Sequence, residues 1–126
     1  MATVELTKEN FADVVGGADV TLIDFWASWC LPCRGFAPVF DEASERHPDV
    51  MFGTVDTEAQ RELAAAFRVM SIPTLVVVRD GLVLYCKSGA LPAETLDELL
   101  TRARELDMDQ VRRNRAARKQ SSDFPR

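Results

Sequence analysis

The chain has 126 residues, 47% of them hydrophobic and 28% charged, and its formal net charge is −5. This length and composition predict one globular domain with a hydrophobic core of its own. They exclude a transmembrane span, because the longest apolar runs are only a few residues, and the acidic balance argues against nucleic acid as the main partner.

The first half of the sequence alternates between helical and strand-like patterns, after a small strand expected at 4–6. Apolar side chains at helical spacing predict a short helix that begins near Phe11 and ends at Gly16-Gly17. Residues 20–26 are apolar and partly β-branched, which is typical of a buried strand. We expect a longer helix at 31–47, which His47-Pro48 ends, and a second buried strand at 50–56.

The second half predicts one more short helix, two strands and a final helix. Leu63, Ala66 and Phe67 mark the short helix, and residues 74–79 and 82–87 are strand-like. Asp80-Gly81 between these two apolar runs indicates a tight hairpin. Leucine and alanine side chains from 96 to 106 form one helical stripe.

These elements predict an α/β fold. The early strand–helix–strand unit should be parallel and right-handed, while the hairpin adds antiparallel strands. We therefore expect a central mixed sheet with helices on both faces, formed by residues 1–106. Residues 107–126 hold six basic and three acidic side chains and little to bury, so we expect a basic extension that is partly helical or disordered.

A pair of cysteines, Cys30 and Cys33, lies where the strand at 20–26 gives way to a helix. The N-terminus of a helix presents unpaired backbone N–H groups and the positive end of the helix dipole. Both effects lower the pKa of a thiol, and the thiolate is the species that attacks disulfides. With two residues between them, the cysteines can close a small disulfide ring at the first helical turn.

Metal binding is the competing interpretation of this pair. A tetrahedral zinc site needs four ligands, and the other candidates are Cys86 and His47. His47 lies about 25 Å along the same helix at 1.5 Å per residue. We therefore expect no metal site and, by the same distance, no Cys–His acyl-transfer enzyme. His47 is expected to be solvated at a helix end, and Cys86 to be a small packing residue in a strand.

The segment FWASWCLPCRGFAPVF resembles the active-site motif of the thioredoxin family, and SIPTLVVVRDGLVLYCKSGA resembles the family's second signature. The match runs from about residue 6 to 106. The segment VDTEAQRELAAAFRVMSIPT looks closest to the bacterial thioredoxin-2 branch. Some members of that branch carry an N-terminal zinc module of four cysteines, which we expect this chain to lack. The resemblance implies a thioredoxin fold.

The resemblance also implies roles for individual residues. Cys30 matches the exposed nucleophile that attacks a substrate disulfide, and Cys33 matches the thiol that resolves the mixed disulfide. Asp24 matches a buried carboxyl group that takes and returns the proton of Cys33. Pro73 matches a cis-proline that turns the backbone of Ile72 toward an incoming peptide.

An apolar rim around the sulfurs is expected to contact the substrate. Its members are Trp29, Leu31, Pro32, Ile72, Pro73, Gly89 and Ala90. Two positions depart from the family pattern. Leu31 stands where the family usually has glycine, which leaves the reduction potential and substrate preference open. Thr54 stands where many members have a lysine beside the buried aspartate, so Asp24 should be harder to ionise.

The sequence therefore predicts a cytoplasmic thiol–disulfide oxidoreductase that reduces disulfides in other proteins. Its N-terminus has no basic or apolar region of a secretory signal, and a reducing compartment suits a catalytic cysteine pair. No bound cofactor is expected, since electrons would come from NADPH through a flavin-containing thioredoxin reductase. We expect a monomer that binds neither membrane nor nucleic acid. The alternatives are a thioredoxin-fold binding or co-chaperone module, and an oxidant or isomerase whose potential Leu31 has altered.

Overall fold

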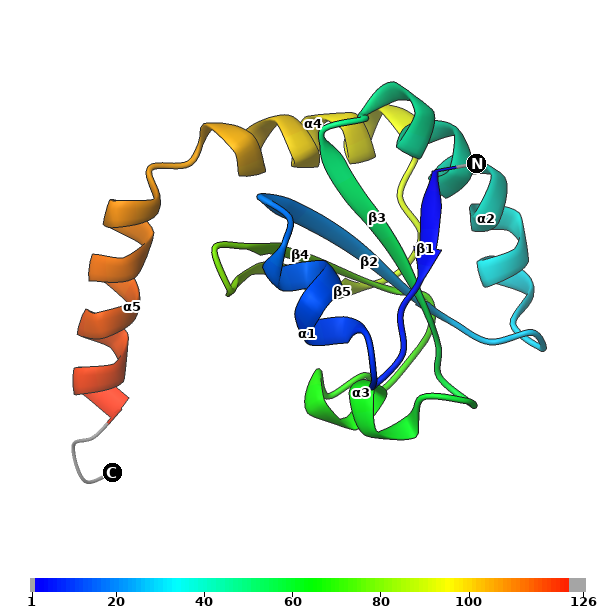
Figure 1. Cartoon of the computed structure of the whole chain (residues 1–126), viewed down its shortest axis with the longest axis horizontal. Helices are drawn as coiled ribbons and strands as arrows, with labels where there is room; N and C mark the ends of the chain where they lie inside the picture. Colours follow the sequence, from blue (N-terminus) through cyan, green and yellow to red (C-terminus); the bar gives the residue numbers. More distant parts are fainter. Residues whose placement is uncertain (1, 123–126) are drawn as a thin grey trace.

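The computed structural model describes residues 2–122, with side chains to residue 117. Every helix and strand predicted from the sequence is present, with bounds that differ by a few residues at most (Figure 1). In chain order the elements are β1 (Thr3–Glu5), α1 (Phe11–Gly16), β2 (Val20–Trp26), α2 (Leu31–Arg46), β3 (Val50–Asp56), α3 (Arg61–Ala66), β4 (Thr74–Arg79), β5 (Leu82–Ser88), α4 (Ala93–Glu105) and α5 (Met108–Ser122).

The five strands form one mixed sheet in the order β1-β3-β2-β4-β5. β3 pairs in parallel with both β1 and β2. β4 pairs antiparallel with β2 on one side and with β5 on the other. The turn between β4 and β5 holds Asp80 and Gly81 at φ +54° and +75°, the left-handed geometry that an Asp-Gly hairpin requires. The predicted mixed sheet is confirmed.

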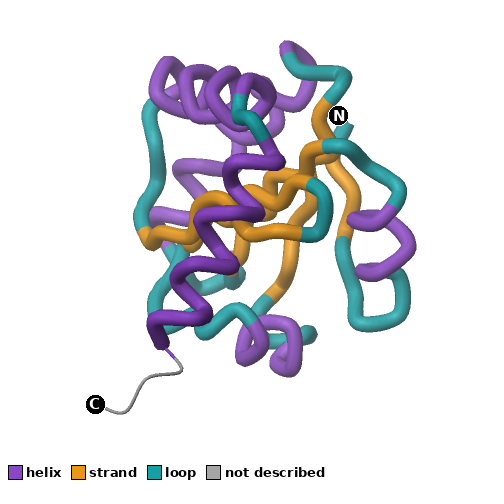
Figure 2. The backbone as a smooth tube through the Cα atoms, turned by 90° about the vertical axis from the view of Figure 1, so that its left-hand side faces the viewer, coloured by secondary structure: helices purple, strands orange, loops and turns teal. Residues whose placement is uncertain are grey.

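The sheet buries a separate apolar cluster on each face. Alternate residues of β2 point to opposite sides, so Leu22 joins one cluster and Ile23 and Phe25 join the other. The first cluster packs against α2 and α4, through residues such as Phe40 and Leu100. The second packs against α1 and α3. Figure 2 shows the strands lying between helices, as predicted for an α/β fold.

Helix α5 lies beside the β4–β5 hairpin and is held there by side chains (Figures 1 and 2). Met108, at its start, is 7% exposed. Arg112 pairs with Asp80 at 3.1 Å, and the guanidinium of Arg115 donates a hydrogen bond to the Val83 carbonyl of β5. The expected basic extension thus contains a helix over most of its length, and residues 123–126 lie outside the described part.

Two predictions about single residues are wrong. The side chain of His47 is 12% exposed rather than solvated, because its Nε2 lies 2.7 Å from Asp97 of α4 and its ring stacks on Phe52. Cys86 is exposed rather than packed, because β5 is an edge strand whose last residues extend past the apolar cluster. Within residues 2–122, the helices lack the length and apolarity that crossing a membrane demands.

Candidate active site

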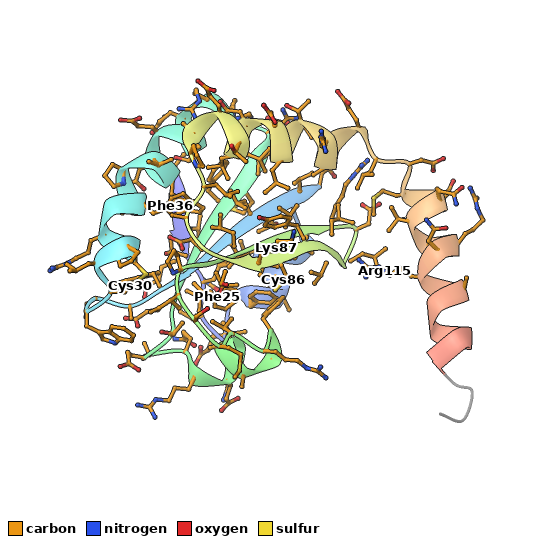
Figure 3. The ribbon with its side chains drawn as sticks, turned by 180° about the vertical axis from the view of Figure 1, so that it is seen from behind. Phe25, Cys30, Phe36, Cys86, Lys87 and Arg115 are labelled. Atoms are coloured by element: carbon orange, nitrogen blue, oxygen red, sulfur yellow. A yellow bond between two sulfur atoms is a disulfide. The ribbon has the colours of Figure 1, made fainter. Side chains whose placement is uncertain are left out.

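Cys30 and Cys33 form a disulfide at the start of α2, with 5.3 Å between their Cα atoms. Figure 3 shows Cys30 at that end of the helix. Cys30 is the N-cap residue, in an extended conformation, and its Sγ accepts a hydrogen bond from the backbone N–H of Cys33 at 3.2 Å. A thiolate at Cys30 would be stabilised by the same N–H and by the helix dipole.

Both sulfurs are shielded in this oxidised form. Cys30 is 4% exposed and Cys33 is 3% exposed, so the expected exposed nucleophile is corrected to a buried one. The sulfur of Cys30 is bonded to Cys33 and also lies 3.7 Å from the carbonyl oxygen of Ile72. Access for a substrate therefore depends on the side chains and backbone that surround the pair.

The residues expected to form the rim come from three separate segments. Trp29 and Leu31 flank Cys30 and are 67% and 72% exposed, and Pro32 is exposed beside them. Ile72 is half-buried and its bond to the buried Pro73 is cis, as the resemblance implied.

The third segment of the rim is anchored to the cis-proline. The N–H of Gly89 donates to the Pro73 carbonyl at 2.8 Å, which brings the turn after β5 to this edge of the site. Gly89 has a φ of +110° that favours glycine. Ala90 follows it as an exposed residue.

A depression of about 440 Å³ is lined by Trp29 and Ile72 of the rim together with Val69, Met70 and Thr57, among others. Met70 is 93% exposed, although a large apolar side chain normally avoids water. Met70 was not among the residues predicted for the site. Its place two residues before the Ile72-Pro73 segment is the signal that would have found it.

Asp24 lies in β2 behind the disulfide and is 4% exposed. Its Oδ1 is buried without a hydrogen-bond partner among the described residues. Burial, together with the negative charge of Asp41, raises its pKa from 3.8 to about 7. A carboxyl group with this pKa can both accept and donate a proton near neutral pH.

A cavity of about 320 Å³ connects this carboxyl group with Cys33. Its lining includes Asp24 from β2, Thr54 from β3, and Cys33, Arg34 and Asp41 from α2. In the parallel register Thr54 is the direct partner of Asp24, so both side chains point to the same face of the sheet. Asp41 was not predicted as a site residue, although its spacing of eight from Cys33 places both on one face of a helix.

The site can therefore cycle between a disulfide and a dithiol, with a proton-accepting group behind the second sulfur. Within the described part of the chain, no three side chains of the His, Cys, Asp and Glu types gather in a way that could hold a metal ion.

Comparison with known proteins identifies a family and several relatives with similar sequences. Residues 2–102 match the family model described as thioredoxin. The chain is 54% identical over 112 residues to a Streptomyces coelicolor protein named "Putative thioredoxin 2", which covers 89% of this chain and 84% of that protein. It is 39% identical over 100 residues to a thioredoxin of Alicyclobacillus acidocaldarius, covering 79% of this chain and 95% of the relative.

A solved structure agrees with these sequence matches. A thioredoxin variant from Halobacterium salinarum superposes with a TM-score of 0.78 at 30% identity, over 82% of this chain and 92% of the other. Helix α5 begins six residues beyond the end of the family match.

Proposed function

Because the chain belongs to the thioredoxin family, we propose that it works in the reducing direction on disulfides of other proteins. It is a thiol–disulfide oxidoreductase, and Cys30 and Cys33 lie within disulfide distance at CxxC spacing. That pair at the N-terminus of α2, with a proton acceptor behind it, is the observation that carries the proposal.

The first step is the attack of the Cys30 thiolate on one sulfur of the substrate disulfide. A bond forms between Cys30 and that sulfur, and the other substrate sulfur leaves as a thiolate that takes a proton from solvent. The N–H of Cys33, which contacts the Cys30 sulfur at 3.2 Å, would stabilise the attacking thiolate. This is the reason that Cys30, rather than Cys33, is assigned as the nucleophile.

The second step releases the substrate. Cys33 gives its proton to the carboxylate of Asp24, and its sulfur attacks the sulfur of Cys30. The bond between Cys30 and the substrate breaks, so the substrate leaves reduced and the protein is left oxidised. Asp24 suits this role because it lines the same cavity as Cys33 and because its pKa is raised to about 7.

Substrate binding is assigned to the apolar rim. The residues proposed for it are Trp29, Leu31, Pro32, Ile72, Pro73, Gly89 and Ala90. The Ile72 carbonyl lies 3.7 Å from the Cys30 sulfur, so an extended peptide that pairs with this backbone would bring its own disulfide to the nucleophile. The exposed side chains of Trp29 and Leu31 offer apolar contact beside it.

We further propose that the oxidised protein is reduced by a flavin-containing thioredoxin reductase that uses NADPH, with no cofactor bound to this chain itself. A supply of electrons from NADPH suits the cytoplasm, where thiols are kept reduced. With the purified protein and a protein disulfide present, such a reductase should oxidise NADPH continuously. Absence of that consumption with a reductase active on other thioredoxins would exclude this electron source.

The midpoint potential of the Cys30–Cys33 couple tests whether the protein reduces or oxidises its substrates. Equilibration in graded dithiol/disulfide buffers should give a reversible two-electron couple at about −270 mV, more reducing than a glutathione pool at about −220 to −260 mV. The Cys86→Ser background removes the exposed third thiol from the count. A clearly oxidising couple would instead support the oxidant or isomerase, and no reversible couple would leave a binding module.

A further inference from the structure

Asp41 shares a cavity with the two groups that exchange a proton. Cys33, Ala37 and Asp41 line it from α2 at intervals of four residues, which places them on one face of the helix. Asp24 lines the same cavity from β2, with Oδ1 buried and unpartnered among the described residues. The side chains of Asp24, Cys33 and Asp41 therefore face a common, partly enclosed space. Its volume of about 320 Å³ is large enough for water.

We propose that Asp41 is a positioning residue for the redox reaction, whose carboxylate makes Asp24 a stronger base toward Cys33. This inference rests on the proton-transfer role proposed above for Asp24. Asp41 touches neither the substrate nor the reacting sulfurs in this scheme. It acts through its negative charge, which makes ionisation of Asp24 less favourable.

Among the described groups around Asp24, Asp41 is the one whose charge opposes its ionisation. Thr54 of β3 and Leu75 of β4 are the register partners of Asp24 on its two sides, and neither is charged. Arg34 of α2 also lines the cavity and has the opposite sign, but it is exposed, so solvent screens its charge. Burial first, and then the charge of Asp41, raise the pKa of Asp24 to about 7.

The chemical consequence lies in the release step. The proton moves from the Cys33 sulfur to Asp24, the Cys33 electron pair forms the bond to Cys30, and the substrate sulfur leaves with the electrons of the broken bond. A base is most effective when its pKa approaches that of the thiol it deprotonates. Loss of the Asp41 charge would make Asp24 weaker as a base and more often ionised at low pH.

Below pH 7 the greater ionisation of Asp24 should speed substrate release, and above pH 7 its weaker basicity should slow release. This reversal gives a test. The rate of substrate release from a preformed mixed disulfide is measured in single turnover from pH 5 to 9. In Asp41→Asn the rate should rise below pH 7 and fall above it, by roughly twofold each way. Carboxyl NMR titration of the same variant should show a lower pKa for Asp24.

The matched control is Glu42→Gln, which removes the same charge from the next residue of α2, at an exposed position. It should leave both the pH profile and the titration of Asp24 unchanged. The inference is overturned if the Asp41→Asn profile does not cross that of the wild type, or if Glu42→Gln produces the same crossing. If Asp24→Asn also leaves the profile unchanged, the role of Asp24 itself fails, and the inference fails with it.

Discussion

Asp24 of β2 and Thr54 of β3 are direct partners in the parallel register, so the side chain beside the buried carboxyl group is a neutral hydroxyl. A positively charged partner at this position would favour the ionised carboxylate. Burial and the negative charge of Asp41 raise the pKa of Asp24 to about 7. Thr54 supplies no positive charge to offset them, so this pKa can be changed from the neighbouring strand.

Introducing a cation at this position should reverse that effect. In Thr54→Lys the ammonium group would reach the cavity, and the pKa of Asp24 should fall because the charged form gains a partner. Carboxyl NMR titration measures the change directly. Thr54→Met is the matched control, since it fills similar space without a charge. Equal pKa values for Asp24 in the wild type and Thr54→Lys would contradict the prediction.

The same carboxyl group should make the stability of the protein depend on pH. Its folded-state pKa of about 7 lies above the ordinary value of 3.8, so the folded state binds this proton more tightly than the unfolded state. The contribution to stability is complete below about pH 4 and is lost as the pH rises to 7, with a total of about 4 kcal/mol at most.

Asp24→Asn should therefore gain stability relative to the wild type as the pH rises. Between pH 5 and 7 the difference in free energy of unfolding should grow by about 1.4 kcal/mol per pH unit and then level off. Urea unfolding of the oxidised proteins measures it. Asp13→Asn, at an exposed site of α1, should show no such trend, and a difference that stays constant with pH would refute the assignment.

Substitutions of Cys30 and Cys33 should block the reaction at different steps. Cys33→Ser should accumulate a mixed disulfide between Cys30 and the substrate, because no thiol remains to resolve it. Cys30→Ser should form no adduct. Each should lower turnover by roughly three orders of magnitude or more, as expected for deleting a nucleophile. Mass spectrometry of the trapped species identifies the attacking sulfur, and Cys86→Ser, at the exposed third cysteine, should retain normal turnover. An adduct on Cys33 would reverse the assignment.

Leu31 should determine part of the substrate preference. Its side chain is 72% exposed beside Cys30, so a bound peptide with an apolar flank can bury it. In Leu31→Gly the kcat/KM for such a peptide disulfide should fall about tenfold, mainly through KM, since partial burial of a leucine is worth about 1.5 kcal/mol. Leu31→Met should preserve the contact. An equal loss for a peptide with polar flanks would show that the effect is not apolar contact.

Local patterns were sufficient to predict most of the fold. β2 and β3 have the bounds that their apolar runs predicted, and Asp80-Gly81 marked the hairpin correctly. These features depend on short-range periodicity and turn geometry, which a sequence displays directly. The position of the cysteine pair between β2 and α2 followed from the same patterns.

Features that depend on distant partners could not be predicted in this way. His47 is largely shielded from solvent because Asp97, fifty residues later, lies against it. Cys86 is exposed because β5 lies at the edge of the sheet, and its residue type alone does not indicate the strand order. Asp41 enters the site only because α2 packs over β2, which brings its side chain to the cavity that Asp24 lines.

Helix α5 should contribute to stability but not to redox chemistry, if residues 1–106 form the catalytic unit. Its described contacts reach Asp80 and Val83 of the β4–β5 hairpin, and Met108 is 7% exposed. The Arg112–Asp80 pair is half-exposed and should contribute little. Burial of Met108 and the Arg115 hydrogen bond, offset by the cost of ordering the helix, should leave a net of about 1–3 kcal/mol.

Two point variants of the full chain separate the contributions of Met108 and Arg115 to stability. Met108→Ala and Arg115→Ala should each lower the free energy of unfolding, whereas Arg113→Ala, at an exposed position of the same helix, should leave it unchanged. A chain that ends after Leu106 should show the combined loss in urea unfolding, with the same midpoint potential and the same turnover as the full chain. A fall in turnover that stability does not explain would mean that α5 takes part in the reaction or in docking the reductase.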